Sequence, residues 1–219
     1  MTEQRRLLHV FQTLMAAYGP QHWWPAESPW EVIVGAILTQ SAAWRNVEKA
    51  IANLKGAGLL DAASIHYASQ ERLAQLVYPS GYYNAKARKL KAFAQRLQEA
   101  HGGDLQRLLA LDVPNLRREL LSIHGVGPET ADSIMLYAAE KPVFVIDAYT
   151  TRIAVRLGLA APKPPYEDLQ ALFMSSLPHD AGLFNEYHAL LVHLGKGACR
   201  KQPLCPDCPL QAECPKCDT

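Results

Sequence analysis

Two glycines and a proline form the part of this sequence whose spacing best suits ligand binding. Gly125 and Gly127 flank a single valine, and Pro128 follows them directly. Glycine permits a tight hairpin, and proline suits the first turn of a helix, where its missing N–H costs nothing. The backbone N–H groups of such a hairpin, with a helix N-terminus, bind an anion such as a phosphate. The alternative is an ordinary helical corner without a ligand.

A carboxylate follows the hairpin. Asp147 ends the apolar run 143–146 and precedes a helical pattern that begins at Ala148. Aspartate is a good N-cap, and a helix N-terminus favours its negative charge. Asp147 is therefore expected to cap the helix. Capping is either its only role or is combined with a catalytic role.

The elements that must position these residues are helices. Apolar residues recur at helical spacing almost throughout, and convincing alternating strands are missing, which indicates an all-α fold. The proline-rich stretch 160–165 is the clearest loop. We expect helical segments at residues 7–15, 30–54, 69–77, 85–100, 104–109, 113–121, 128–140, 148–157, 166–176 and 181–194.

Five cysteines lie near the carboxyl end of the sequence. Metal ligation is a better interpretation than disulfides if the thiols stay reduced, as they do in the cytosol. Cys199, Cys205, Cys208 and Cys214 supply the four thiolates that an iron–sulfur cluster needs. The last three of these with Cys217 would instead form a cramped tetrathiolate zinc site. A cluster, a zinc ion and no metal are the three alternatives.

Composition limits the size of the core, the charge and the class of protein to be expected. The chain has 219 residues, of which 49% are hydrophobic, enough for one large or two small domains. The formal net charge of +1 gives no basic field over the whole molecule, so any grip on nucleic acid must come from local groups. No apolar stretch suits a membrane span or a signal peptide, so we expect a cytoplasmic protein without membrane contact.

The segments 125–132 and 145–152 resemble the helix–hairpin–helix and catalytic-aspartate segments of the endonuclease III superfamily of DNA glycosylases. The similarity runs from about Trp23 to Cys214. It implies base-excision repair of double-stranded DNA that contains a damaged base, by a nucleoid-associated protein that we expect to be a monomer. It also implies two helical lobes, residues 24–141 with the hairpin and residues 1–23 with 142–219. The flipped base would enter a cleft between them.

The resemblance implies how the lobes hold DNA. The hairpin grips the backbone, and basic side chains in a helix after an aromatic turn and in the cysteine loop reach phosphates. Solvated surface charge is the alternative for the basic residues. The expected DNA contacts are Gly125, Val126, Gly127, Thr130, Lys86, Arg200 and Lys201.

The resemblance also implies the catalytic groups. Asp147 would stabilise the positive charge that develops on the sugar during glycosidic cleavage. Bifunctional members carry a lysine where this chain has Glu129, and that amine attacks the sugar C1′. A carboxylate forms no imine, so a monofunctional enzyme that uses water is expected, with Glu129 and Asp147 as catalytic residues. The alternatives are a solvated Glu129, a bifunctional glycosylase and AP lyase on oxidised pyrimidines, and a non-catalytic module that binds damaged DNA.

Gln40 matches the glutamine that fills the space left by the flipped base in this family. Trp23, Trp24 and Trp44 resemble the aromatic pocket of its 3-methyladenine branch. Aromatic faces attract a desolvated cation by about 2 kcal/mol, and a 3-methylated purine is cationic. Alkylated purines are therefore the expected lesion, whereas core packing is the alternative role of each tryptophan.

The resemblance assigns Cys199, Cys205, Cys208 and Cys214 to a [4Fe–4S] cluster in the loop 199–214 and leaves Cys217 as a spare. The first gap between these cysteines is one residue shorter than the usual family pattern. The fold class that follows is an all-α, two-lobed helix–hairpin–helix glycosylase with a carboxy-terminal iron–sulfur loop.

Overall fold

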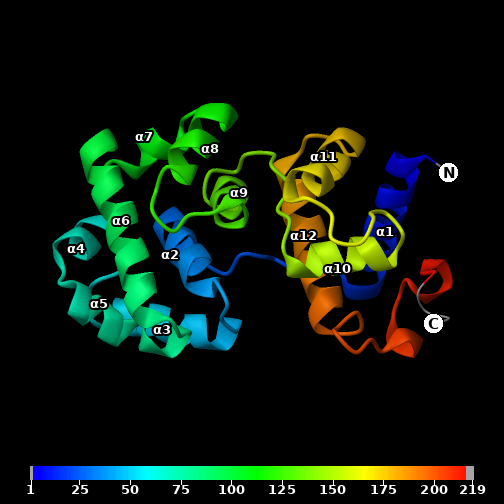
Figure 1. Cartoon of the computed structure of the whole chain (residues 1–219), viewed down its shortest axis with the longest axis horizontal. Helices are drawn as coiled ribbons and strands as arrows, with labels where there is room; N and C mark the ends of the chain where they lie inside the picture. The colour runs from blue at the N-terminus through cyan, green and yellow to red at the C-terminus, as the bar shows by residue number, and fades with distance from the viewer. Residues whose placement is uncertain (1, 216–219) are drawn as a thin grey trace. The chain divides into compact units, whose positions relative to one another are not determined.

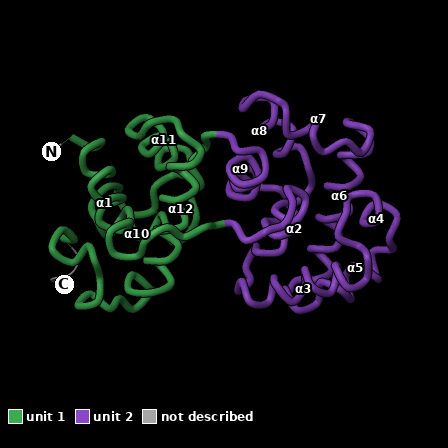
Figure 2. Tube along the Cα trace, turned by 180° about the vertical axis from the view of Figure 1, so that it is seen from behind, with its two compact units in different colours: residues 1–23, 142–219 green, residues 24–141 purple. Residues whose placement is uncertain are grey.

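The computed structural model describes residues 2–215, and its secondary structure within that range is entirely helical. The all-α prediction is therefore confirmed. The chain divides into two compact units (Figure 2). Unit 1 combines residues 1–23 with 142–219, and unit 2 is the continuous segment 24–141.

Unit 2 is built around one buried helix. Every residue from Trp30 to Leu38 in α2 is buried, and all of them except Glu31 are apolar, as expected of a helix at the centre of a core. It packs against α3, α6 and α9. The helices of unit 2 are α2 (Pro29–Thr39), α3 (Trp44–Gly56), α4 (Ala62–Tyr67), α5 (Gln70–Leu76), α6 (Tyr83–His101), α7 (Leu105–Leu109), α8 (Val113–Leu121) and α9 (Pro128–Tyr137), with the 3-10 turn η1 (Tyr78–Ser80).

Unit 1 joins the two ends of the chain around α12. Its helices are α1 (Glu3–Tyr18), α10 (Ala148–Arg156), α11 (Tyr166–Ser176) and α12 (Ala181–Lys196), followed by the 3-10 turns η2 (Cys205–Asp207) and η3 (Gln211–Glu213) (Figure 1). Helix α12 packs against α1 and α10. Phe144 stacks on Phe173 with 4.2 Å between ring centroids, and the Tyr187 hydroxyl donates to the carbonyl of Leu7 at 2.9 Å.

The number of helices differs from the sequence-based expectation at two places. The expected segment 30–54 is two helices, because the chain turns between α2 and α3 and Ser41 adopts a left-handed conformation at φ 53°. Helix α4 was not expected, since six residues carry too little hydrophobic pattern. Its N-cap Asp61, which accepts from the N–H of Ser64 at 2.9 Å, was the available signal.

None of the described helices combines the length and the apolar character that crossing a membrane requires.

Candidate functional site

The hairpin of unit 2 connects α8 to α9. Gly125 has φ +85°, and a Cβ on it would overlap the side chain of Lys89, so glycine is needed both for the backbone conformation and for the close approach. The N–H of Val126 donates to the carbonyl of Ile123 at 3.1 Å, and the Val126 side chain is buried. The expectation that this N–H faces an anion is therefore wrong, because the turn itself uses it.

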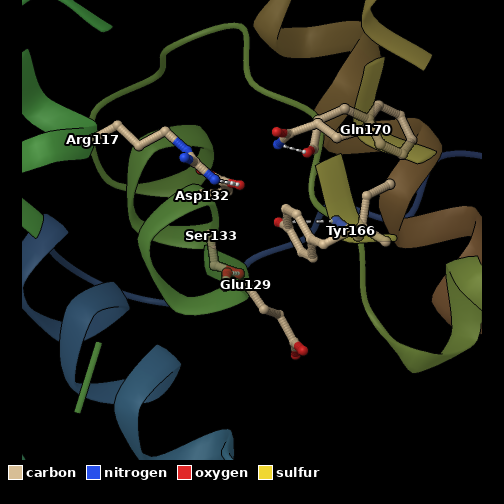
Figure 3. A network of polar contacts seen from close by, with 8 residues as sticks. Arg117, Glu129, Asp132, Ser133, Tyr166 and Gln170 are labelled. Atoms are coloured by element: carbon tan, nitrogen blue, oxygen red, sulfur yellow. Dashed lines mark hydrogen bonds and ion pairs between the residues drawn. The ribbon is translucent and has the colours of Figure 1, made fainter. Parts of the chain in front are cut away.

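The first turn of α9 is the remaining part of the hairpin where an anion is expected. Gly127 is its exposed N-cap and supplies no side chain to satisfy the first N–H groups, which have no partner within a helix. Glu129 is exposed in this turn, whereas Thr130 is buried. Figure 3 shows the Glu129 carboxylate extending away from the ion pair between Arg117 and Asp132.

That ion pair links α8 to α9. The Arg117 Nε lies 2.9 Å from Oδ1 of Asp132, whose side chain is completely buried (Figure 3). The Ser133 hydroxyl donates to the carbonyl of Glu129 at 2.7 Å. Removal of one partner from a buried ion pair is strongly destabilising, so this contact holds the hairpin in place.

Gln40 joins the end of α2 to the hairpin. Its Nε2 donates to the Gly125 carbonyl at 3.0 Å and to the Thr130 hydroxyl at 2.9 Å. The Lys89 ammonium donates to its Oε1. Thr130 therefore takes part in the site through Gln40 and not through an exposed side chain. The sequence did not single out Lys89, although its place one helical turn after Lys86 was a signal.

The structure corrects the expectation that Lys86 reaches a DNA phosphate. Its side chain is buried, and Nζ donates to the carbonyls of Leu38 and Ser80 at 2.8 and 2.6 Å. Burial lowers the pKa of Lys86 to about 8, and the charge of Lys89 acts in the same direction. Lys86 therefore ties the end of α2 to η1 inside unit 2. The following turn places Tyr82 on the surface at φ 46°, an unfavourable backbone conformation of the kind found at functional sites.

An aromatic cluster lies near the start of unit 2. The Trp24 ring is 5.3 Å from Trp44 and 5.2 Å from Tyr137, measured between centroids. Gly35 makes room for this cluster, because a Cβ there would stand 3.0 Å from Cζ2 of Trp24. The structure thus brings two of the expected pocket residues, Trp24 and Trp44, together and adds Tyr137, which the sequence did not single out.

Trp23 belongs to unit 1 and has other neighbours. The Lys196 ammonium lies 5.3 Å from the centroid of its ring. Trp23 and Trp24 are adjacent in sequence but are divided between the two units.

Asp147 caps α10 in unit 1. Its Oδ1 accepts from the N–H of Thr150 at 2.7 Å, and its Oδ2 lies 3.7 Å from Nε2 of His188. The segment before it is held by Gln170, whose Nε2 donates to the carbonyl of Phe144 at 2.7 Å, and by Tyr166, whose hydroxyl accepts from the N–H of Ile146 at 3.5 Å (Figure 3). The expected cap is therefore present, and the second carboxylate oxygen faces His188.

The four described cysteines of the terminal loop are all partly exposed. Burial raises the pKa of the Cys208 thiol, a hydrogen bond from Leu210 opposes this, and the negative charges of the other three thiols raise it further. The other three thiols therefore all lie within electrostatic reach of Cys208. No three His, Cys, Asp or Glu side chains in residues 2–215 are grouped so as to hold a single metal ion. Cys217 lies outside the described residues.

Two arginines of α10 brace this loop. The Arg156 Nη1 donates to the sulfur of Cys199 at 3.3 Å and to the carbonyl of Arg200 at 2.7 Å. The Arg152 Nε donates to the carbonyl of Cys199 at 2.9 Å. The side chains of Arg200 and Lys201 are exposed, as a role in phosphate binding requires.

Known proteins are similar to this chain in sequence and in fold. The family described as HhH-GPD superfamily base excision DNA repair protein matches residues 34–179. A putative DNA repair glycosylase of Methanocaldococcus jannaschii is 45% identical over 206 residues, 94% of each chain. Endonuclease III of Thermotoga maritima is 31% identical over 85% of this chain and 82% of that protein. A crystal structure of the H. pylori 3-methyladenine DNA glycosylase bound to 1,N6-ethenoadenine has a TM-score of 0.75 and 27% identity, and covers 90% of this chain and 98% of that one.

Proposed function

We propose, for a chain that belongs to the HhH-GPD superfamily of base excision DNA repair proteins, that it removes alkylated purines from double-stranded DNA by hydrolysis alone. The chain is a DNA glycosylase of that superfamily and has its all-α helix–hairpin–helix fold. The observation that carries the finer proposal is Glu129, exposed in the first turn of α9 where bifunctional members carry a lysine. A side chain without an amine forms no Schiff base with the sugar.

Asp147 and water would carry out the reaction. Once the damaged base is flipped out of the stack, its glycosidic bond to C1′ lengthens and positive charge develops on the sugar. The Asp147 carboxylate, fixed by its hydrogen bond from the N–H of Thr150, stabilises that charge. A water oxygen forms the new bond to C1′, the base leaves with the electrons of the broken bond, and the water proton passes to a carboxylate. Asp147 and Glu129 are the proposed catalytic residues.

The lesion class rests on the aromatic residues. Trp24, Trp44 and Tyr137 present ring faces and edges in one cluster, and such faces attract a cationic purine. The similarity to the 3-methyladenine glycosylase supports the same class of lesion. We propose that Trp23 and Gln40 also contribute to recognition of the lesion. Gln40 would exchange its hydrogen bonds to the hairpin for contacts with the DNA bases next to the lesion.

DNA would be held at the hairpin and at the cysteine loop. The open N–H groups of Gly125, Gly127 and the first turn of α9 suit a phosphate, and Arg200 and Lys201 suit a second part of the backbone. Lys86 is left out of this surface because its ammonium is bonded inside the protein. We expect the protein to act as a monomer.

We propose that Cys199, Cys205, Cys208 and Cys214 hold a [4Fe–4S] cluster. The chemistry of the donor set fits, since four thiolates are what such a cluster takes. The other three thiols also lie close enough to Cys208 to influence its pKa, which supports a shared site that the four of them would form. When bound, the cluster ties down a loop that contributes little to the apolar core. Visible absorbance of the purified protein, followed by iron and sulfide analysis, tests it; one zinc and no sulfide would contradict it.

A base-release screen tests the main proposal. Duplexes carrying a single 3-methyladenine analogue, 1,N6-ethenoadenine or thymine glycol are incubated with protein, and strands are examined with and without alkali. We expect release of the alkylated purine and strand breaks after alkali only. Asp147→Asn should lower the rate by about 10²–10³-fold while DNA binding persists.

Borohydride trapping separates the rival function. The similarity to endonuclease III favours a bifunctional enzyme as the second candidate, and Lys89 at the hairpin is the amine that such an enzyme would use. Wild type should give no covalent adduct with DNA, whereas an adduct that disappears in Lys89→Met would establish the bifunctional reaction. DNA binding without release of any base would establish a non-catalytic module.

A further inference from the structure

His188 is a buried titratable residue beside Asp147 to which the proposed reaction assigns no role. It lies on α12, and its Nε2 is 3.7 Å from Oδ2 of Asp147. The two side chains are only 7% and 13% exposed, respectively. Because both groups are largely removed from water, the charge of one acts strongly on the other.

Only one carboxylate oxygen of Asp147 faces the imidazole of His188. Oδ1 of Asp147 is taken by the N–H of Thr150 at 2.7 Å, so Oδ2 is the oxygen that faces His188. The imidazole is held in place by packing, because α12 lies against α10 and α1, and the neighbouring Tyr187 is anchored to Leu7. The pair is therefore a fixed feature of unit 1 and not a chance contact of two mobile side chains.

The surroundings determine the charge of His188. Burial lowers its pKa, the negative charge of Asp147 opposes this, and the positive charge of Lys196 lowers the pKa further. Asp147 comes from the start of α10, and Lys196 from the end of α12. Elsewhere on α12, Tyr18 of α1 stacks on His193, and the ring of Phe173 of α11 lies against Tyr187. The imidazole is consequently neutral at neutral pH and becomes charged only in acid.

We infer that His188 is a positioning residue that controls the effective charge of Asp147. As a neutral imidazole it leaves the carboxylate with its full negative charge, and as an imidazolium it cancels that charge. This inference rests on the proposed role of Asp147 in stabilising a positively charged sugar. Base release should therefore decline in acid as His188 gains a proton, because the charge that stabilises the transition state is then neutralised.

Base release under single-turnover conditions between pH 4.5 and 8.5 tests this role, with methylated duplex DNA as the substrate. His188→Gln keeps an N–H donor but has no proton to gain, so its acid decline should begin at lower pH than in wild type. His101→Gln is the matched control, since His101 also lies near a carboxylate, 3.4 Å from Glu119, but in unit 2. It should keep the wild-type profile.

The shape of the profile distinguishes control of charge from a structural role. A structural role would lower the rate of His188→Gln by the same factor at every pH. The inference requires instead that the ratio of mutant to wild-type rate increases about tenfold for each unit by which the pH falls below the start of the wild-type decline. A constant ratio overturns it. His188→Asn repeats the measurement if the glutamine variant does not fold.

A titration of the imidazole by NMR gives a readout that does not depend on base release. In Asp147→Asn the His188 signals should titrate at lower pH than in wild type, because the attraction that raises its pKa is lost. An unchanged titration overturns the pairing even when wild type releases alkylated bases normally. If wild type releases no base while the titration shifts as expected, the proposed function fails and the pairing stands.

Discussion

Because of Lys86, the free energy of unfolding of unit 2 should increase at alkaline pH. Its side chain is 1% exposed, and burial lowers its pKa from 10.5 to about 8. At 1.36 kcal/mol for each pH unit, this difference corresponds to about 3 kcal/mol. Below pH 8 both the folded and the unfolded chain carry the proton, and the folded state bears the full cost of the buried charge.

The sign of the effect follows from the number of protons bound. Between about pH 8 and 10.5 the unfolded chain keeps the proton on Lys86 and the folded chain does not. The free energy of unfolding therefore rises with pH across this window. Lys86→Met has no such proton. Across this pH window the unfolding free energy of wild type should therefore increase by about 3 kcal/mol relative to that of the variant.

Urea unfolding followed by circular dichroism at pH 7, 8.5 and 10 measures this difference. Comparison of the two proteins at each pH removes the contribution of all other titrating groups. Lys86→Arg is the matched control, since it remains charged throughout and should also lack the alkaline gain. A difference between wild type and Lys86→Met that stays constant from pH 7 to 10 would refute the buried, weakly basic lysine.

Two further predictions concern packing and the terminal loop. In Gly195→Ala the new Cβ would stand 2.5 Å from Cδ1 and 2.8 Å from Cβ of Tyr149, so the free energy of unfolding should fall by about 1–3 kcal/mol in urea titrations. Gly56→Ala, which has open space around it, should not be destabilised, and equal losses in both variants would count against the steric argument. Cys208→Ser should bleach the visible absorbance expected of a cluster and lower the unfolding temperature of unit 1. Full colour in that variant would exclude Cys208 as a ligand.

Local signals predicted the parts of the site that depend on neighbours in the sequence. Pro128 at the first position of α9 and Asp147 before an apolar helical pattern mark helix starts, and the structure has a helix beginning at each place. Gly125 was expected in a special backbone conformation, and it adopts φ +85°. These features need no knowledge of distant residues.

The predictions that were wrong or missing concern residues whose contacts come from distant parts of the sequence. A lysine in a basic helix is usually solvated, and only the packing of α2 and η1 around Lys86 makes it a buried one. The turn at Ser41 was missed because a left-handed serine has no strong signature in sequence. The contacts of Gln40 with Gly125 and Thr130 join segments 85 and 90 residues apart, which no local pattern specifies.

The discontinuity of unit 1 affects how the chain can fold during synthesis. Leu7 and Tyr187, which are joined by a hydrogen bond, are separated by 180 residues. At about 5–20 residues per second, the ribosome needs roughly 9–36 s to deliver the second partner after the first. Unit 2 is continuous and can fold in that interval, whereas the apolar face of α1, with Leu7, Val10 and Leu14, must wait uncovered. The amino-terminal helix is therefore the segment of the nascent chain that most needs protection from aggregation.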